Sequence, residues 1–213
     1  MSLSTDEQDE LRSTARRLLE QRSSPEQVRA AIDGPDGYDE GLWDQMVALG
    51  WTSIHLDESF GGAGCGYADL AVVLHELGRA ITPSPLVASA MLASGAFSLA
   101  DNDALAADVL ASLAAGESRG AVAMAGLGGS YQSDQLTTEW RTDADGSVRL
   151  DGASGFVVDA DLADLLVVVA RGVDGAIAVV AVDPAAPGVG IDRLETVDRT
   201  RRLFTVTFAD VAV

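Results

Sequence analysis

The pattern of apolar residues changes from helical to strand-like close to Gly116, and this change constrains the fold more than any other feature. Before that point, apolar side chains recur at the three- and four-residue spacing of helices that bury one face. After it, they form short runs separated by Asp-Gly turn pairs at 145–146, 151–152 and 174–175. We therefore predict an α+β chain, with an all-α helical domain over residues 1–117 and a mostly antiparallel β-barrel or β-sandwich domain over 118–213.

Explicit signals mark the expected helices of the first half. Ser4 and Glu7 form a capping-box pattern, and Ser24 before Pro25 begins a second helix. The remaining helices are expected at residues 39–49, 67–77, 86–99 and 103–115. In the helix expected at 39–49, the predicted buried residues are Trp43, Met46, Val47 and Leu49. Gly50 is expected to end this helix, and Gly78 is expected to end the helix at 67–77.

The second half contains seven expected strands. They span residues 121–125, 136–141, 148–150, 156–158, 165–170, 176–182 and 203–208. The apolar run at 165–170 lies between turn residues, which predicts a strand buried on both faces at the centre of the domain. Asp174-Gly175, between two apolar runs, is the clearest hairpin signal, and Asp151-Gly152 is expected to form a turn as well.

The composition excludes several classes of function. The chain has 213 residues and a formal net charge of −19, whereas nucleic-acid binding requires clustered Lys and Arg. The single cysteine, Cys65, rules out an internal disulfide framework and fits a reducing compartment. The chain enters a helix without a charged-then-apolar leader, and no apolar run approaches the ~18–20 residues of a membrane span. We expect a cytoplasmic protein with no nucleic-acid partner and no membrane span.

Two glycine-rich loops invite a phosphate-binding interpretation. The loop at residues 60–66 lacks the Lys-Ser/Thr pair of a P-loop and the strand–loop–helix context of a dinucleotide site, so we interpret it as structural. The loop at residues 126–130 follows a strand-like run, and its backbone N–H groups could hold a pyrophosphate or a flavin edge. A plain turn explains the second loop equally well.

An aromatic residue and a β-branched residue, Phe156 and Val158, stand just before the acidic elbow at 159–161. This pair could line a flat ligand, or both side chains could face the core of the β-domain. Arg199, Arg201 and Arg202 form a basic cluster that could meet phosphate or pair with the acidic surface.

The chain shows no pattern typical of a metal site or of a nucleophilic enzyme. Its two histidines, His55 and His75, are isolated in the sequence, and no cluster of Cys, His or carboxylates with ligand spacing surrounds either of them. No nucleophile elbow occurs either. We therefore expect no metal ligand and no Ser/His/Asp set.

Four segments together resemble the acyl-CoA dehydrogenase family. Residues 49–64 (LGWTSIHLDESFGGAG) and 75–85 (HELGRAITPSP) resemble its N-terminal domain. Residues 151–170 and 197–208 (VDRTRRLFTVTF) resemble its middle domain. The resemblance covers essentially the whole chain and is nearest to actinobacterial members that often work as paired, unlike subunits, some of them on sterol side chains.

The resemblance implies a concrete function. Family members use FAD to oxidise an acyl-CoA thioester to the trans-2-enoyl-CoA in fatty acid or sterol side-chain breakdown. A carboxylate removes the α proton, the β hydride goes to the flavin, and electrons leave to an electron-transfer flavoprotein. The family's aromatic-x-Thr motif falls on 156–158, and its Thr-Glu-Pro-Gly segment falls near 125–128. The implied cofactor-binding residues are Ala123, Ala125, Gly126, Gly128, Gly129, Ser130, Phe156 and Val158.

The departures from the family pattern are equally informative. Val158 stands where the family has threonine, Ala125 or Gly126 stands at the other threonine, and Asp57 replaces a proline. The family's C-terminal helical bundle, which carries the catalytic glutamate and the core of the tetramer, is expected to be absent, so we predict no catalytic residue in this chain. Two hypotheses follow. In the first, this chain is a subunit of an FAD-dependent dehydrogenase and is incomplete alone. In the second, it is a non-catalytic partner that completes the pocket of a flavin-binding paralogue in a dimer or tetramer. A ligand-binding module unrelated to flavin is a third interpretation.

Overall fold

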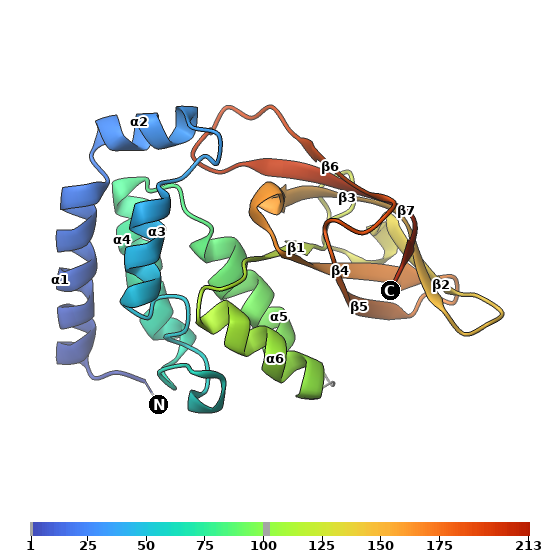
Figure 1. Cartoon of the computed structure of the whole chain (residues 1–213), viewed down its shortest axis with the longest axis horizontal. Helices are drawn as coiled ribbons and strands as arrows, with labels where there is room; N and C mark the ends of the chain where they lie inside the picture. The colour runs from blue at the N-terminus through green and yellow to red at the C-terminus, as the bar shows by residue number, and fades with distance from the viewer. Residues whose placement is uncertain (1, 100–102) are drawn as a thin grey trace. The chain divides into compact units, whose positions relative to one another are not determined.

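The computed structural model describes residues 2–99 and 103–213. The chain divides into two compact units, Met1–Ser118 and Arg119–Val213. The first is helical and the second is built from strands, as the blue-to-green and yellow-to-red ribbons of Figure 1 show. The predicted order of an all-α part followed by a β part is confirmed.

The helical unit contains six α-helices within the described ranges, together with a 3₁₀ turn and a π-helical turn. They are α1 (Thr5–Arg22), α2 (Pro25–Asp33), α3 (Glu40–Ala48), η1 (Glu58–Phe60), α4 (Tyr67–Ala80), η2 (Val87–Ala93), α5 (Ser94–Ser98) and α6 (Asp103–Ala114).

The two predicted helix starts are confirmed by their cap geometry. The Ser4 side chain accepts from the N–H of Glu7, and the Glu7 carboxylate accepts from the N–H of Ser4 at 2.8 Å. Ser24 and Gln27 form the same reciprocal pair before α2, with Pro25 at its first position. These bonds satisfy N–H groups that have no partner inside a helix, which explains why the sequence signal is local and reliable.

Three helix predictions are wrong in detail. Helix α4 continues through Gly78 to Ala80, and its left-handed end residue is Ile81, with φ of 53°. Leu49, predicted to be buried, is 47% exposed because it lies beyond the end of α3. Leu42, which was not in the predicted set, is a buried residue of this helix. The helix predicted at 86–99 begins as the π-helical turn η2 before α5.

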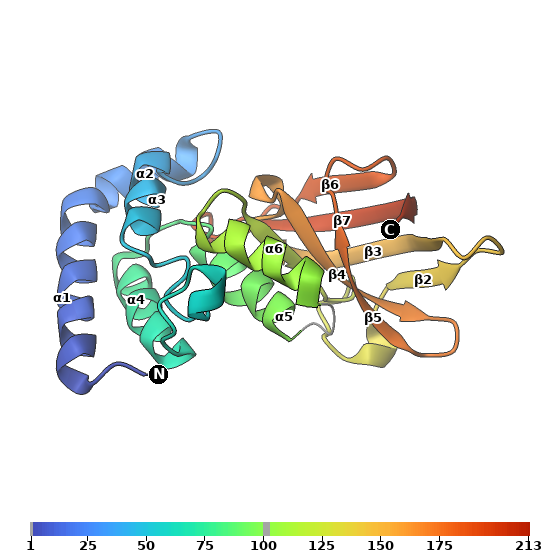
Figure 2. The same cartoon turned by 60° about the horizontal axis from the view of Figure 1, so that its bottom comes forward.

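Helices α1 and α4 lie side by side and run in the same direction (Figures 1 and 2). Near their first turns, Gln8 Nε2 donates to Asp69 Oδ1 at 2.9 Å. Two turns later, Arg16 donates to the buried carboxylate of Glu76 at 2.8 Å, and Arg79 donates to the same group at 2.7 Å. The apolar faces of these helices meet α3 in a core that includes Leu19, Leu42, Trp43, Met46, Trp51, Val73, Leu77 and Leu86.

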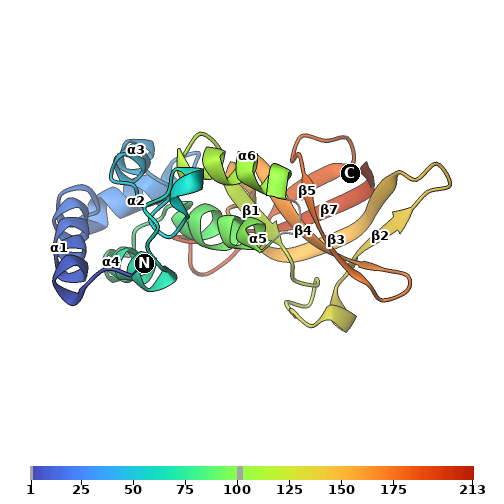
Figure 3. The ribbon, with the colours of Figure 1, turned by 90° about the horizontal axis from the view of Figure 1, so that it is seen from below.

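The β unit forms one seven-stranded sheet. Its strands are β1 (Gly120–Ala123), β2 (Thr138–Thr142), β3 (Val148–Val158), β4 (Leu165–Gly172), β5 (Ile177–Val182), β6 (Val189–Arg193) and β7 (Leu203–Ala212). The order is β1-β4-β2-β3-β7-β6, with β5 paired to β4. Four of the six pairings are antiparallel, and β4 pairs parallel with β1 and β2. Figure 3 shows the hairpins β2–β3 and β4–β5.

The predicted central strand is confirmed. Leu166, Val167 and Val168 of β4 are consecutive and at most 2% exposed, so the strand is buried on both faces. The predicted hairpin at 174–175 is also confirmed, since Gly172 N–H donates to Ala176 O at 2.7 Å and β4 pairs antiparallel with β5. The core of the unit includes Leu150, Val157, Leu166, Val168, Val182, Phe204, Val206, Phe208 and Val211.

Two strand predictions are wrong. Asp151-Gly152 does not turn the chain, because β3 runs unbroken from Val148 to Val158 and absorbs Gly152 as a bulge with φ of 108°. A Cβ atom at 152 would stand 2.1 Å from Thr137 O, so the strand approaches its neighbour too closely for any side chain. Strand β6 was not predicted, because its glycine-containing sequence acquires strand structure only by pairing with β7.

No helix in the described part of the chain has the length and apolar character needed to cross a bilayer.

Candidate functional site

The candidate site lies where β3 carries its second bulge. The register of β3 against β7 shifts between Ser154 and Val157, and Phe156 sits in this bulge with a left-handed φ of 55°. Such a backbone is strained for an aromatic residue, and bulges re-aim side chains next to functional sites. Phe156 is 43% exposed as a whole residue, whereas Val157 is 1% exposed. Phe156 therefore faces outward, which excludes the interpretation that its ring fills the core.

The loop at residues 126–130 is held against this bulge by backbone hydrogen bonds. Gly155 N–H donates to Ala125 O at 3.1 Å, and the Ser154 hydroxyl donates to the same oxygen at 2.7 Å. Within the loop, Gly126 N–H donates to Ser130 O at 2.9 Å. The loop and the bulge thus form one continuous surface although they are separated by some thirty residues of sequence.

Glycine is required at several points of this surface because the backbones approach closely. A Cβ atom at 129 would stand 3.2 Å from Cε2 of Phe156, and one at 155 would stand 3.2 Å from the oxygen of Gly126. A Cβ atom at 126 would lie only 2.1 Å from Gln135 O. Any side chain at 126 would have to displace the backbone at 135.

The loop presents backbone donors that the protein does not use. Gly129 N–H donates to Gly126 O at 2.8 Å, and Leu127 N–H donates to the Thr137 hydroxyl at 3.0 Å. No described residue accepts from the N–H groups of Gly128 or Ser130. Two backbone donors beside an exposed aromatic ring form a surface suited to a flat ligand with hydrogen-bond acceptors.

The sequence-predicted site residues divide into two groups. Ala123 and Ala125 are buried, so they contribute to the surface of the loop and the bulge only through their backbone and their small size. Gly126, Gly128, Gly129, Ser130 and Phe156 come together at the loop and the bulge, and Val158 follows half-buried at the end of β3. The same segment also exposes apolar side chains that were not singled out from the sequence, Met124 at 37%, Leu127 at 52% and Tyr131 at 66%.

Asp159, directly after β3, has an unusual electrostatic environment. Its backbone is left-handed, with φ of 52°. Burial raises the pKa of its carboxyl to about 7, with Asp161 adding to the rise and Arg201 and Arg202 opposing it. Arg202 is itself 6% exposed and forms an ion pair with Asp161 at 3.1 Å. The Arg202 side chain of the predicted basic cluster therefore pairs with the acidic elbow.

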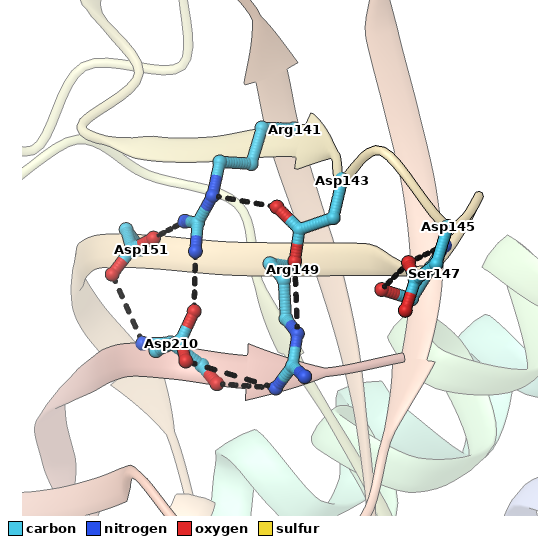
Figure 4. Close-up of polar contacts among 7 residues, drawn as sticks. All are labelled: Arg141, Asp143, Asp145, Ser147, Arg149, Asp151 and Asp210. Carbon is cyan, nitrogen blue, oxygen red and sulfur yellow. Dashed lines mark hydrogen bonds and ion pairs between the residues drawn. The ribbon is translucent and has the colours of Figure 1, made fainter.

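A second cluster of charges, drawn in Figure 4, joins β2, β3 and β7. Arg141 forms ion pairs with Asp143, Asp151 and Asp210, and Arg149 pairs with Asp143 at 3.4 Å and with Asp210 at 3.7 Å. Both cations are already matched by carboxylates, so this cluster holds strands together. Within residues 2–99 and 103–213, no three His, Cys, Asp or Glu side chains gather in a way that could hold a metal ion.

The order of a helical unit and then a mostly antiparallel β unit is shared with solved structures of acyl-CoA dehydrogenases. Residues 5–117 match the model of the acyl-CoA dehydrogenase N-terminal domain. The chain belongs to the acyl-CoA dehydrogenase family. It is 43% identical over 88 residues to acyl-CoA dehydrogenase IpdE2 of Mycolicibacterium smegmatis, an alignment that covers 41% of this chain and 28% of that protein.

Solved structures agree with this assignment. The Tcur3481-Tcur3483 steroid ACAD G363A variant superposes with a TM-score of 0.87 at 30% identity, covering 97% of this chain and 56% of that chain. The ChsE4-ChsE5 complex from Mycobacterium tuberculosis gives a TM-score of 0.86 at 24% identity, over 99% and 56%. An acyl-CoA dehydrogenase complexed with FAD from Bacillus anthracis gives 0.85 at 20% identity, over 99% and 36%, and shows the shared fold. The chain thus spans 36% to 56% of these solved chains.

Proposed function

We propose that this chain is a subunit of an FAD-dependent acyl-CoA dehydrogenase and supplies one wall of the flavin site. The assembled enzyme would oxidise an acyl-CoA thioester to the 2-enoyl-CoA in fatty acid or sterol side-chain breakdown. The observation that carries this proposal is the exposed Phe156 ring on a strained bulge against the 126–130 loop, in a chain of this family. We assign residues 1–117 to the N-terminal helical domain and 118–213 to the middle β-domain.

The residues present fit a flavin ring. A planar tricyclic ring needs an apolar wall and a few hydrogen-bond donors, and Phe156 and half-buried Val158 would supply the wall. The unused N–H groups of Gly128 and Ser130 would supply donors. Gly126 and Gly129 would let the loop pack closely against Gln135 and Phe156, which fixes the shape of this surface.

When bound, FAD would supply the two-electron oxidising capacity that no amino-acid side chain has. The residues of this chain would bind the ring, orient it and exclude water from one face. No residue of this chain is assigned as the base that removes the substrate proton. That group would come from a C-terminal domain or from a partner subunit of a homo- or hetero-oligomer. An electron-transfer flavoprotein would accept the electrons.

A second function is supported by a specific observation. Positions 125, 126 and 158 carry Ala, Gly and Val, none of which has a hydroxyl group to donate to the flavin. A subunit that no longer binds FAD could still complete the scaffold and the substrate pocket of a flavin-binding paralogue. The named ChsE4-ChsE5 complex among the structural relatives is an assembly of two components and supports a paired arrangement for this chain.

Flavin absorbance separates the two functions. The chain is expressed alone and together with the product of the neighbouring gene, and the visible spectrum of each purified sample is recorded with its protein stoichiometry. Flavin bound to this chain when it is expressed alone supports the first function. Flavin present only in the complex, at one per partner and unaffected by Phe156→Ala, supports the second function. Flavin in neither sample, with FAD added during purification, contradicts the first.

A further inference from the structure

The loop at residues 126–130 belongs to a longer excursion of the chain that ends where β2 begins. Gly126 N–H donates to Ser130 O at 2.9 Å, and Gln135 N–H donates to Gln132 O at 2.9 Å, so the excursion contains two short turns. Each turn fixes only its own neighbours, and a surface loop keeps one conformation only where further bonds join its ends. The candidate flavin surface depends on such bonds.

One side-chain hydroxyl, that of Thr137, joins the start of this excursion to its end. Leu127 N–H donates to Thr137 Oγ1 at 3.0 Å across ten residues of sequence. The same hydroxyl donates its single proton to Ala153 O at 2.6 Å. Because a main-chain N–H can only donate, the hydroxyl oxygen accepts from Leu127 while its proton serves Ala153. Thr137 thus ties the loop to β3 just before the bulge that carries Phe156.

The backbone of Thr137 is itself held by β3. Ala153 N–H donates to Thr137 O at 3.1 Å. A Cβ atom at 152 would stand 2.1 Å from the same oxygen, so the two backbones are in close contact at the first bulge of β3. The hydroxyl that accepts from Leu127 therefore belongs to a residue whose place the sheet fixes.

A second hydroxyl, that of Ser154, holds the residue just before the loop. It donates to Ala125 O at 2.7 Å, and Gly155 N–H donates to the same oxygen at 3.1 Å. Ser154 is 1% exposed, so its bond is buried, whereas Thr137 is exposed and can be replaced without opening the core. Thr137 is therefore the member of this pair whose role can be tested separately from folding.

We propose that Thr137 is a positioning residue of the flavin site, whose hydroxyl holds Leu127 N–H so that the N–H groups of Gly128 and Ser130 face the ligand. The identity of the ligand rests on the proposed function. Thr137 would not touch the flavin. Because each peptide unit is planar, a fixed Leu127 N–H also fixes the plane between residues 126 and 127, and few dihedral angles then remain to set the direction of the donors that follow.

Isosteric and conservative variants of the full chain without flavin test the first step. Thr137→Val keeps the shape of the side chain and removes the hydroxyl, whereas Thr137→Ser keeps the hydroxyl. Thr142→Val is the matched control, because Thr142 is exposed on β2 and its hydroxyl has no hydrogen bond to a described residue.

Amide exchange followed by NMR reports on the loop. We expect exchange of the Leu127 amide to become about fivefold faster in Thr137→Val, and to stay within about twofold of the parent in Thr137→Ser and Thr142→Val. An unchanged Leu127 rate in a folded Thr137→Val variant would overturn the proposal.

Flavin titration of the same variants, alone and with the product of the neighbouring gene, tests the consequence for binding. We expect FAD to bind Thr137→Val about fivefold more weakly than the parent, and Thr137→Ser within about twofold of it. Recovery by serine, which lacks the methyl group, would exclude lost packing as the cause. Faster Leu127 exchange with unchanged FAD affinity would refute a role for Thr137 in the flavin site. FAD binding by neither the parent chain nor its complex would instead contradict the proposed function, and the Leu127 rates would still decide whether Thr137 holds the loop.

Discussion

The ring of Phe156 lies against the backbone of Gly129, so closely that a Cβ atom at 129 would stand 3.2 Å from ring atom Cε2. The two residues come from different segments, one from a bulge with φ of 55° and the other from a glycine loop with φ of 80°. Both residues have a left-handed backbone, which is unfavourable for residues with a side chain. Such conformational strain is typical of functional sites. The candidate flavin wall depends on this contact.

Replacing Phe156 with glycine separates function from folding. Glycine adopts the left-handed backbone freely, a gain of about 1 kcal/mol, which offsets the lost burial of a residue that is 43% exposed. We expect the free energy of unfolding to change by less than about 1 kcal/mol, while FAD affinity falls at least about tenfold. Urea unfolding and flavin titration measure the two effects. A large loss of stability with unchanged flavin binding would show that the ring is structural.

Val158→Thr should strengthen flavin binding. The substitution is similar in size and places a hydroxyl on the half-buried residue beside the proposed ring position. One added hydrogen bond is worth about 1 kcal/mol, or roughly a fivefold gain in FAD affinity. Val179→Thr, on the exposed part of β5, is the matched control and should leave the affinity unchanged. If both variants bind FAD like the parent chain, position 158 does not face the flavin.

Asp159→Asn should stabilise the protein at alkaline pH. Burial raises the folded-state pKa of Asp159 to about 7 from its usual value of 3.8, so the native state is destabilised increasingly as pH rises between these values. Asparagine tolerates the left-handed backbone and carries no charge. We expect a gain of about 1 kcal/mol or more above about pH 8, shrinking toward zero below about pH 4. A gain of equal size at both pH values would rule out titration as its cause.

Glu76→Gln should destabilise the helical unit in a pH-dependent way. Hydrogen bonds and charge attraction from Arg16 and Arg79, opposed by burial, lower the pKa of Glu76 from 4.5 to about 2. The stabilisation is complete above the unfolded pKa of 4.5 and is lost as the pH falls toward 2. We expect a loss of about 2 kcal/mol at neutral pH and almost none near pH 2.

The helical circular dichroism signal during urea unfolding at several pH values measures this loss. Glu20→Gln is the control, because Glu20 is 63% exposed and lies 3.9 Å from Arg79. The control should change stability by less than about 0.5 kcal/mol. A loss for Glu76→Gln that persists at the acid end would mean that packing, rather than the ion pairs, is responsible.

Arg141→Ala should weaken the strand cluster of Figure 4 mainly at low salt. The substitution leaves Asp143, Asp151 and Asp210 facing one another, but these side chains are 38%, 47% and 63% exposed and are screened by solvent. We expect a loss of about 1 kcal/mol at low ionic strength that shrinks in high salt. Arg193→Ala is the control, because Arg193 is an exposed residue of β6 and its removal changes the net charge by the same amount. It should lower the free energy of unfolding by less than Arg141→Ala does. Equal losses for both variants would point to net charge alone.

The local signals in the sequence predicted the structure well because each rests on bonds between neighbours. Ser4 with Glu7, Ser24 with Pro25, and the Asp174-Gly175 pair form the caps and the hairpin that their residue types require. The helix-to-strand change near 116 and the order of the two units follow from periodicity, which is also a local property.

The remaining features depended on contacts between distant segments. An Asp-Gly pair makes a hairpin at 174–175 but a bulge at 151–152, because the chain at 152 lies against Thr137 O. His55 is isolated in the sequence, yet its Nε2 lies 2.9 Å from the hydroxyl oxygen of Ser94, 39 residues away. The sequence by itself therefore determined most of the elements and their caps. Only the tertiary structure decided the bulges, strand β6 and the surface around Phe156, because these arise where backbones far apart in the chain approach each other.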